Sequence, residues 1–298
     1  ALKLAEIMLE AGVPDGVINV VPGPGPTAGA RLASHPDVNR IAFTGSTATG
    51  RKIVEASAGN MKTVAVELGG KSPDIVFEDA DLDLAVPGAA LGCFNNTGQV
   101  CYAGTRLFVQ RSIHDEFARK LAAFAATLKV GDSLDPGTQL GPLVSQAQLQ
   151  RVSGYVELAQ QEGAQLLFGG QRLSGELADG YYFSPTVLAG VRNDMRIAQE
   201  EIFGPVVSII PFDDEEEVVR LANATEYGLG GAVWTQNVGR AHRMSRAIKA
   251  GVVWVNCYGV TDPSTAYGGT KMSGYGSKGG FRHIEDYLHS KTVWIRTA

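Results

Sequence analysis

The sequence predicts an α/β protein built from two regions, because strand-like and helix-like segments alternate along most of its 298 residues. Glycine-rich turns separate the first strand-like runs from the helices that follow them. This order of strand, turn and helix is typical of βαβ units with a parallel sheet. In open sheets of this kind, ligands bind at the carboxyl ends of the strands.

The first region begins with an apolar helical pattern over residues 1–11, which Gly12 and Pro14 end. A helix that starts at residue 1, with neither an initiator Met nor a cap, leads us to expect further sequence upstream. Strands and helices then alternate: we expect strands in GVINVVPG (16–23), NRIAFTGS (39–46) and KTVAVELGG (62–70), and helices at 27–34 and 46–58.

The second region begins near Ser72 and repeats the alternation. A long amphipathic helix is expected at 112–130, with Ser112 as its cap, and a glycine-rich segment spans 263–280. The other expected strands are 74–79, 105–110, 206–212, 230–237, 251–256 and 291–297, and the other expected helices are 79–94, 214–224 and 239–248.

Composition excludes several classes of protein. A net charge of −5 and a pI near 5.6 argue against a nucleic-acid partner or an acidic membrane surface. No apolar stretch is long enough to span a bilayer. Three distant cysteines make no disulfide framework, which favours a reducing cytoplasm, and the five histidines lack metal-ligand spacing, so we expect no metal.

Cys101 is the most unusual of the three cysteines. It lies in NNTGQVCYAG (95–104), among small and polar residues, whereas Cys93 has the apolar neighbours Leu91 and Phe94 that a packed cysteine usually has. Glycines on both sides would let the backbone approach a ligand and leave the sulfur accessible. The local sequence leaves a chemical role and a packing role both open.

Three further motifs also have two interpretations each. In FTGSTATG (43–50), Ser46 would begin a helix and either bind a phosphate or simply cap the turn. Glu67 ends an apolar strand, as a solvated strand end or as a general base. Glu200 and Glu201 precede a strand, where they form a charged surface or bind ribose hydroxyls.

Taken together, the motifs resemble those of the NAD(P)-dependent aldehyde dehydrogenase superfamily. The resemblance covers essentially the whole chain, in family order: PGPGPTAG, FTGSTATG, VELGGKSP, NNTGQVCYAG, EEIFGPV, NCYGV and YGGTKMSGYG. It implies a Rossmann-like parallel cofactor domain over 1–70, incomplete at its N-terminus, and an α/β catalytic domain over 71–270. A return segment and an oligomerisation strand would follow over 271–298.

The resemblance also implies a reaction, the oxidation of a small-molecule aldehyde to its acid with NAD or NADP. Cys101 would attack the carbonyl to give a thiohemiacetal, its backbone N–H would supply half of an oxyanion hole, and Glu67 would activate the water that releases the acyl group. The implied cofactor residues are Gly25, Gly45, Ser46, Gly50, Leu68, Glu201 and Phe203; those of the substrate funnel are Asn95, Tyr258, Thr261 and Tyr267, with Asn256 nearby.

Departures from the family pattern leave alternatives open. The upstream Trp-Asn-x-Pro and Lys-Pro-x-Glu segments of the family do not occur here, and a missing central strand would leave 16–21 and 62–68 without their shared neighbour. Pro87 falls inside an expected helix, and Ser277-Lys278 replaces Arg-Glu. The chain is then either an enzyme or a non-catalytic fragment that only binds or oligomerises. A relative acting on acyl phosphate or acyl-CoA is a third reading, against which Glu67 argues. A homo-oligomer, dimer or tetramer, is expected.

Overall fold

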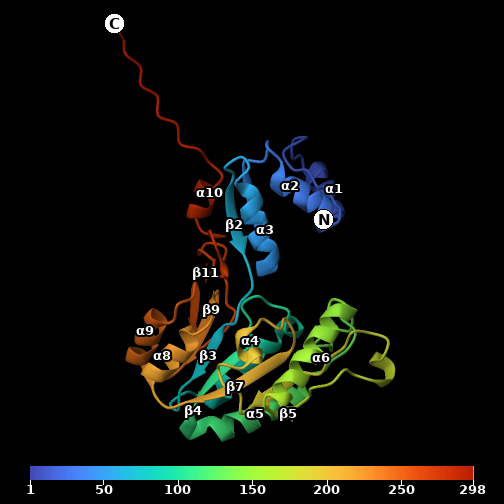
Figure 1. Cartoon of the computed structure of the whole chain (residues 1–298), viewed down its shortest axis with the longest axis vertical. Helices are drawn as coiled ribbons and strands as arrows, with labels where there is room; N and C mark the ends of the chain where they lie inside the picture. Colours follow the sequence, from blue (N-terminus) through green and yellow to red (C-terminus); the bar gives the residue numbers. More distant parts are fainter. Residues whose placement is uncertain (298) are drawn as a thin grey trace.

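The structure is a computed structural model that describes residues 1–297, and it has two lobes (Figure 1). The small lobe is built on a three-stranded sheet, in the order β1 (Arg40–Thr44), β2 (Thr63–Glu67) and β12 (Gly274–Tyr275). The large lobe is built on a seven-stranded sheet, and β8 (Tyr227–Gly228) pairs with β11 (Thr270–Lys271) in a separate two-stranded sheet. The predicted α/β class with a Rossmann-like parallel portion is confirmed.

In the small lobe, β1 and β2 run parallel and are joined by α3 (Thr47–Ser57). Ser46 caps this helix, because its hydroxyl accepts a hydrogen bond from the Thr49 N–H at 3.3 Å. β12 pairs antiparallel with the other edge of β2. The expectation that 62–68 lacks a neighbour is therefore wrong: the returning chain supplies one.

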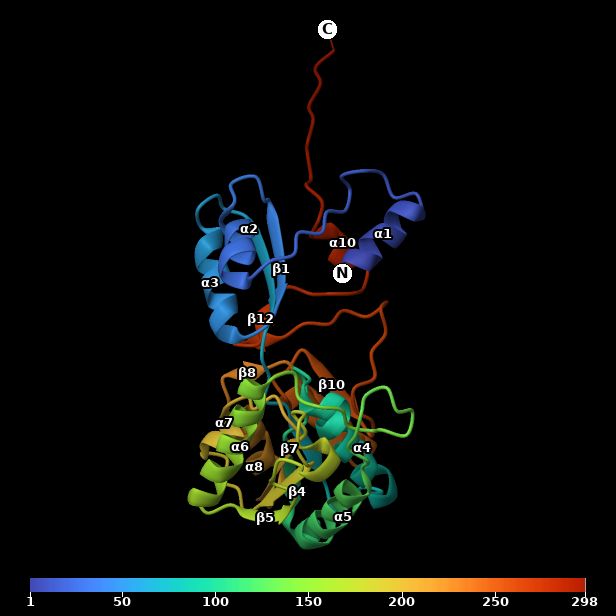
Figure 2. The same ribbon diagram turned by 90° about the vertical axis from the view of Figure 1, so that its right-hand side faces the viewer.

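The first residues of the small lobe differ from the prediction. They form α1 (Leu2–Glu10), a π-helical turn η1 (Gly25–Gly29) and α2 (Ala30–Ser34), and α2 and α3 lie on the same side of β1 (Figure 2). The strand expected at 16–23 is wrong, since this segment forms turns and irregular chain. Apolar alternation makes a strand only where a neighbour can pair with it, and no strand within residues 1–297 lies beside this segment to do so.

The seven-stranded sheet is parallel except at one edge, where β5 (Gln165–Phe168) and β6 (Thr186–Ala189) pair antiparallel. Its five inner strands are buried on both faces, whereas the two edge strands are partly exposed, which explains why inner strands read as continuous apolar runs such as VVSIIPF. In spatial order the seven strands are β10 (Val252–Val255), β9 (Gly230–Trp234), β3 (Pro73–Val76), β4 (Arg106–Gln110), β7 (Val206–Phe212), β6 and β5.

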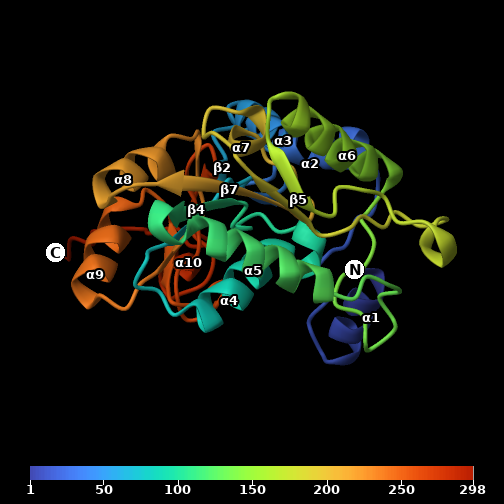
Figure 3. The same cartoon turned by 90° about the horizontal axis from the view of Figure 1, so that it is seen from below.

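Helices cover both faces of this sheet and complete two apolar cores (Figure 3). On one face lie α4 (Leu82–Phe94) and α5 (His114–Thr127). On the other lie α6 (Gln146–Gln161), α7 (Arg196–Gln199), α8 (Glu215–Asn223) and α9 (Val238–Ala247). The short helices are η2 (Asn95–Gly98), η3 (Arg111–Ile113), η4 (Gly175–Leu177) and α10 (Arg282–Glu285).

Two more local predictions are wrong. Ser112 does not cap α5: it lies in the turn η3, its hydroxyl donates to the Glu78 carboxylate at 2.8 Å, and the helix begins at His114. Residues 291–297 form no strand but extend away from both lobes (Figure 1, Figure 2), because no strand within the described residues pairs with them.

The functional motifs meet where the lobes join. β2 ends at Glu67 and passes through Gly69 and Gly70 into β3, while α4 passes through η2 into the segment that carries Cys101. In η2, Asn96 and Thr97 adopt left-handed φ angles of 51° and 56°, which turn the chain sharply after the helix. No helix within residues 1–297 combines the length and the apolar character that crossing a membrane requires.

Candidate active site

A cavity of about 530 Å³ lies at the junction of the two lobes. Both lobes contribute to it: Thr44 and Glu67 end the parallel strands β1 and β2, and Cys101 comes from the large lobe. Strand ends are therefore the source of its polar wall, as expected for an open parallel sheet. The remaining lining residues are Tyr102, Thr261, Asp262, Pro263, Thr265, Tyr267, Lys278 and Gly279.

Cys101 presents a half-buried thiol to this cavity. Its sulfur lies 3.7 Å from the Tyr267 hydroxyl oxygen. Burial raises the pKa of the thiol, the hydrogen bond from Tyr267 opposes that effect, and the carboxylates of Glu201 and Glu67 add to it. Cys93, by contrast, is fully buried inside α4, where burial raises its thiol pKa strongly. Cys101 is thus the thiol that both faces a cavity and has a hydrogen-bond donor.

Close backbone packing holds the Cys101 segment in place. A Cβ atom added to Gly70 would lie 2.2 Å from the carbonyl oxygen of Cys101. Real Cβ atoms do not approach an oxygen so closely, so this position requires glycine. The Gly-Gly pair after β2 therefore lets the loop that carries the thiol approach the strand that carries Glu67.

Glu67 is a buried carboxylate without a partner. Its residue is 4% exposed, and neither carboxylate oxygen has a hydrogen-bond partner within residues 1–297. Burial raises the pKa of Glu67 to about 7, and the positive charge of Lys278, followed by the nearby backbone N–H of Gly269, limits the rise. A carboxylate that titrates near neutral pH is suited to accept and return a proton.

Glu201 lies close to the same junction from the large lobe. Its carboxylate accepts a hydrogen bond from the Gly70 N–H at 3.2 Å, and burial raises its pKa. A Cβ at Gly69 would lie 2.4 Å from that carboxylate, so this second glycine also permits a close approach. The Glu200 side chain instead pairs with Arg196 and Tyr155.

Phe203 has a left-handed φ of 61°, which turns the chain just after Glu201. The amide of Gln148 fixes this turn, because it donates to the carbonyl oxygens of Ile202 and Phe203 at 2.8 Å each. An α6 side chain therefore sets the direction of the predicted cofactor residue.

The other predicted cofactor residues fall in three places. Gly45 and Ser46 are exposed at the start of α3, next to Thr44 of the cavity wall. Gly50 and Leu68 pack together and line a separate cavity of about 270 Å³, where a Cβ on Gly50 would lie 2.5 Å from the Leu68 side chain. Gly25 lies in the exposed turn η1.

The predicted substrate residues divide between two cavities. Thr261 and Tyr267 line the cavity of Cys101, whereas Asn95 and Tyr258 line a neighbouring one of about 300 Å³. Tyr102 lines both, and its carbonyl oxygen accepts a hydrogen bond from the Tyr258 hydroxyl at 2.6 Å.

Asn256, expected near the substrate funnel, turns its side chain to the backbone of the chain after β9. Its side-chain amide exchanges two hydrogen bonds of 3.0 Å with the backbone of Thr235, and it lines neither of these cavities. Its amide groups are satisfied by the end of β9, which gives it a structural place instead.

Sequence reasoning missed Lys278 and Thr44 as cavity residues. In the sequence, Lys278 differs from the family pattern, but nothing there places it in a cavity. Its ammonium group donates to the Thr44 hydroxyl at 2.5 Å, and its backbone N–H and C=O each bond Tyr267 at 2.7 Å. Since these contacts join segments far apart in the chain, no local pattern could have indicated them.

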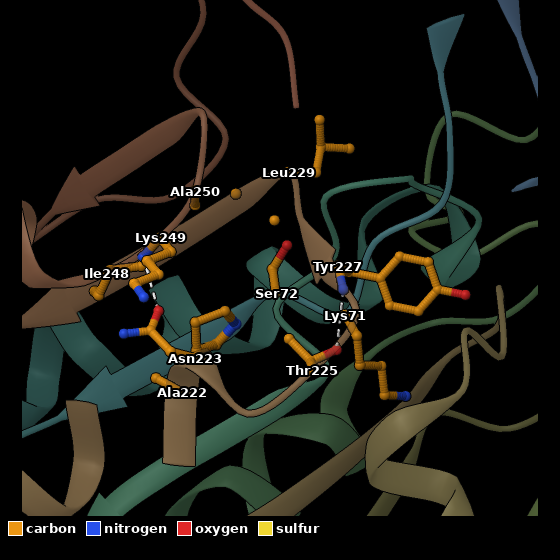
Figure 4. Close-up of a pocket in the computed structure, with 13 residues that line it drawn as sticks. Lys71, Ser72, Ala222, Asn223, Thr225, Tyr227, Leu229, Ile248, Lys249 and Ala250 are labelled. Atoms are coloured by element: carbon orange, nitrogen blue, oxygen red, sulfur yellow. Dashed lines mark hydrogen bonds between the residues drawn. The ribbon is translucent and has the colours of Figure 1, made fainter. Parts of the chain in front are cut away.

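A smaller pocket lies beneath the lobe junction, lined by Lys71, Ser72, Asn223, Thr225 and others (Figure 4). Its volume of about 10 Å³ admits at most a water molecule. Lys71 is 1% exposed, its ammonium has no partner within residues 1–297, and burial lowers its pKa to about 7. The pocket is too small for a substrate.

Comparison with known proteins gives the family. The aldehyde dehydrogenase family model matches residues 1–293. A betaine aldehyde dehydrogenase of Rhizobium leguminosarum bv. trifolii is 50% identical over 99% of this chain and 60% of its own length. One of Agrobacterium fabrum is 48% identical over 100% of this chain and 60% of its own.

Solved structures agree with this result. PnpE from Pseudomonas sp. WBC-3 is 48% identical, with a TM-score of 0.96 over 99% of this chain and 60% of its own. A betaine aldehyde dehydrogenase of Staphylococcus aureus in complex with NAD+ is 40% identical, with a TM-score of 0.95 over 97% and 58%. The chain therefore spans about 60% of the length of such relatives, and it belongs to the aldehyde dehydrogenase family.

Proposed function

We propose that this chain carries the thiol site of an enzyme that oxidises a small-molecule aldehyde to its carboxylic acid with NAD or NADP. The observation that supports it most is that Cys101 and Glu67 line one cavity at the lobe junction. An accessible nucleophile and an unpartnered buried carboxylate are the two groups that covalent catalysis followed by hydrolysis requires.

Cys101 is the proposed nucleophile. After it loses its proton, its thiolate sulfur would bond to the aldehyde carbon, the C=O π bond would break, and the carbonyl oxygen would become an alkoxide. The backbone N–H of Cys101 is the proposed oxyanion donor, since backbone donors are already oriented before the reaction begins. The glycine at position 70 supports this role, because it allows the loop to sit against β2.

The proposed cofactor residues lie at the start of α3, in η1, in the packed pair at α3 and in the turn after α7; they are Gly45, Ser46, Gly25, Gly50, Leu68, Glu201 and Phe203. The exposed N-terminus of α3, an 11-residue helix, fits a dinucleotide, because its free N–H groups and dipole attract phosphate. A nicotinamide dinucleotide bound there would supply the hydride acceptor for the oxidation. Two relatives have solved structures with NAD bound, the Staphylococcus aureus protein and PnpE.

Glu67 is the proposed general base. It would take a proton from water, whose oxygen attacks the acyl carbon bound to Cys101, and the sulfur would leave as thiolate. A pKa of about 7 keeps a large fraction of this carboxylate deprotonated at neutral pH while leaving it basic enough to accept a proton. This base also argues against a reaction that ends with transfer to phosphate or CoA.

Domain bounds, cellular compartment and oligomeric state are proposed as well. We propose a cofactor domain over 1–70, a catalytic domain over 71–270 and a return segment over 271–298, supported by the two main sheets. The three cysteines of the chain are unpaired, which supports a reducing cytoplasm. A homo-oligomer is proposed from the exposed apolar side chains of Val293, Trp294 and Ile295.

The test uses the 298-residue chain and p-nitrophenyl acetate, an ester that acylates a reactive thiol without a cofactor. Cys101→Ala should abolish hydrolysis, while Cys257→Ala should retain it. Aldehyde oxidation is then assayed with NAD and with NADP. If the chain shows neither Cys101-dependent hydrolysis nor aldehyde oxidation, that result would support the alternative, a folded domain that only binds or oligomerises.

A further inference from the structure

We propose that Tyr267 is a further catalytic residue, whose phenol donates a hydrogen bond to the Cys101 sulfur and stabilises it as a thiolate. The proposal rests on the proposed function and adds a residue to the same site. It would provide what the rest of the cavity lacks, a side-chain donor directed at the nucleophile.

The contact itself is direct. The Tyr267 hydroxyl oxygen lies 3.7 Å from the Cys101 sulfur, and both side chains line the same cavity. Within residues 1–297 this is the only side chain that forms a hydrogen bond with that sulfur. Burial, followed by the neighbouring thiol, raises the pKa of the phenol far above its ordinary value, so the hydroxyl keeps its proton and acts as the donor.

The surroundings of the sulfur make such a donor valuable. Burial disfavours the thiolate, and the carboxylates of Glu201 and Glu67 disfavour it further. A hydrogen bond to a charged acceptor is stronger than one to a neutral acceptor, and it is stronger still away from bulk water. The phenol therefore offsets part of the penalty that burial and the two carboxylates place on the thiolate of Cys101.

Tyr267 is held rigidly in this position. Its backbone N–H and C=O form hydrogen bonds of 2.7 Å with the backbone C=O and N–H of Lys278. This pair of bonds is an isolated antiparallel bridge between two parts of the glycine-rich segment. Its ring packs edge-on against Tyr102, with the ring centroids 6.1 Å apart and the planes at 71°. A donor fixed from both backbone and ring loses little entropy when the hydrogen bond strengthens.

The experiment measures Cys101 alkylation by iodoacetamide as a function of pH in the 298-residue chain, with peptide mapping to assign the label. Tyr267→Phe removes only the hydroxyl. It should move the midpoint of the pH–rate profile upward by about one unit and slow alkylation at pH 7 about tenfold. Tyr102→Phe is the matched control. It removes a hydroxyl from the same cavity, but this hydroxyl makes no hydrogen bond to the sulfur, so the midpoint of the pH–rate profile should not change.

Two outcomes separate this proposal from the proposed function. If Cys101 is the reactive thiol but Tyr267→Phe leaves its midpoint unchanged, the role of Tyr267 is wrong and the proposed function stands. If Cys101→Ala retains ester hydrolysis, the proposed function itself fails. Cys93 reports on folding in every variant, because a thiol that is 1% exposed stays unlabelled only while α4 remains packed.

Discussion

Lys278 places its positive charge in the same cavity as the Glu67 carboxylate, and that charge limits how far burial raises the Glu67 pKa. The two residues come from opposite ends of the chain and meet because β12 returns to pair with β2. The proposed general base is thus tuned by a residue that stands where the family often has a glutamate.

Lys278→Met should therefore raise the Glu67 pKa above about 7. Fewer carboxylates would be deprotonated at neutral pH, so steady-state hydrolysis of p-nitrophenyl acetate should fall at pH 7 and recover at higher pH. The measurement is the pH profile of that hydrolysis. Lys120→Met is the control, since Lys120 pairs with Glu116 on α5, far from the cavity. An unshifted profile in Lys278→Met would contradict the coupling.

Glu67→Gln should allow acylation of Cys101 but slow its release. With no base to activate water, a burst of p-nitrophenol should precede a steady state slower by about 10² or more. Stopped-flow absorbance separates the two phases, and Glu176→Gln, an exposed change in η4, should behave like the parent. Equal steady-state rates would show that Glu67 only ends a strand.

Glu67→Gln should also stabilise the fold at alkaline pH. The folded-state pKa of about 7 exceeds the ordinary value of 4.5, so the folded chain holds this proton more tightly than the unfolded chain. The tighter proton binding therefore contributes to the stability of the folded chain. This contribution is fully present below pH 4.5 and is lost as pH rises through 7, because a charged carboxylate must then stay buried. Urea unfolding at pH 8.5 should favour the variant by up to about 3 kcal/mol, and at pH 4.5 the difference should nearly vanish.

Gly70→Ala should disrupt the site through the backbone. The new methyl group would meet the Cys101 carbonyl oxygen at 2.2 Å, which forces the loop to move. We expect a loss of about 1–3 kcal/mol in stability and at least a tenfold loss of Cys101-dependent ester hydrolysis. Gly154→Ala on α6 is the matched control, because nothing lies within 4 Å of its added Cβ. It should leave hydrolysis intact and stabilise the helix slightly. Full hydrolysis in Gly70→Ala would mean that the loop has room to adapt.

Cys101 should be alkylated by iodoacetamide before Cys93 and Cys257. Cys101 should react first because its sulfur faces a cavity. A low thiol pKa is not the reason, since burial raises the pKa of Cys101. Its labelling should therefore accelerate as pH rises above neutral. Preferential labelling of either other cysteine, read by mass spectrometry of tryptic peptides, would remove Cys101 as the nucleophile.

The sequence alone determined the elements whose signal is local. Runs such as VVSIIPF form buried parallel strands because a sheet covered on both faces leaves no polar side. Ser46 caps α3 because its hydroxyl bonds an N–H three residues on, and Glu67 ends its strand as predicted. The motif order was also enough to indicate the family.

Only the tertiary structure decided which segments find partners. Residues 16–23 and 291–297 carry strand-like patterns, yet neither pairs within the described chain, because a strand needs a neighbour that periodicity cannot supply. The contacts of Tyr267 with Cys101 and of Lys278 with Glu67 join segments distant in sequence. Burial then set their protonation: the same glutamate would titrate near 4.5 in water and titrates near 7 in this cavity.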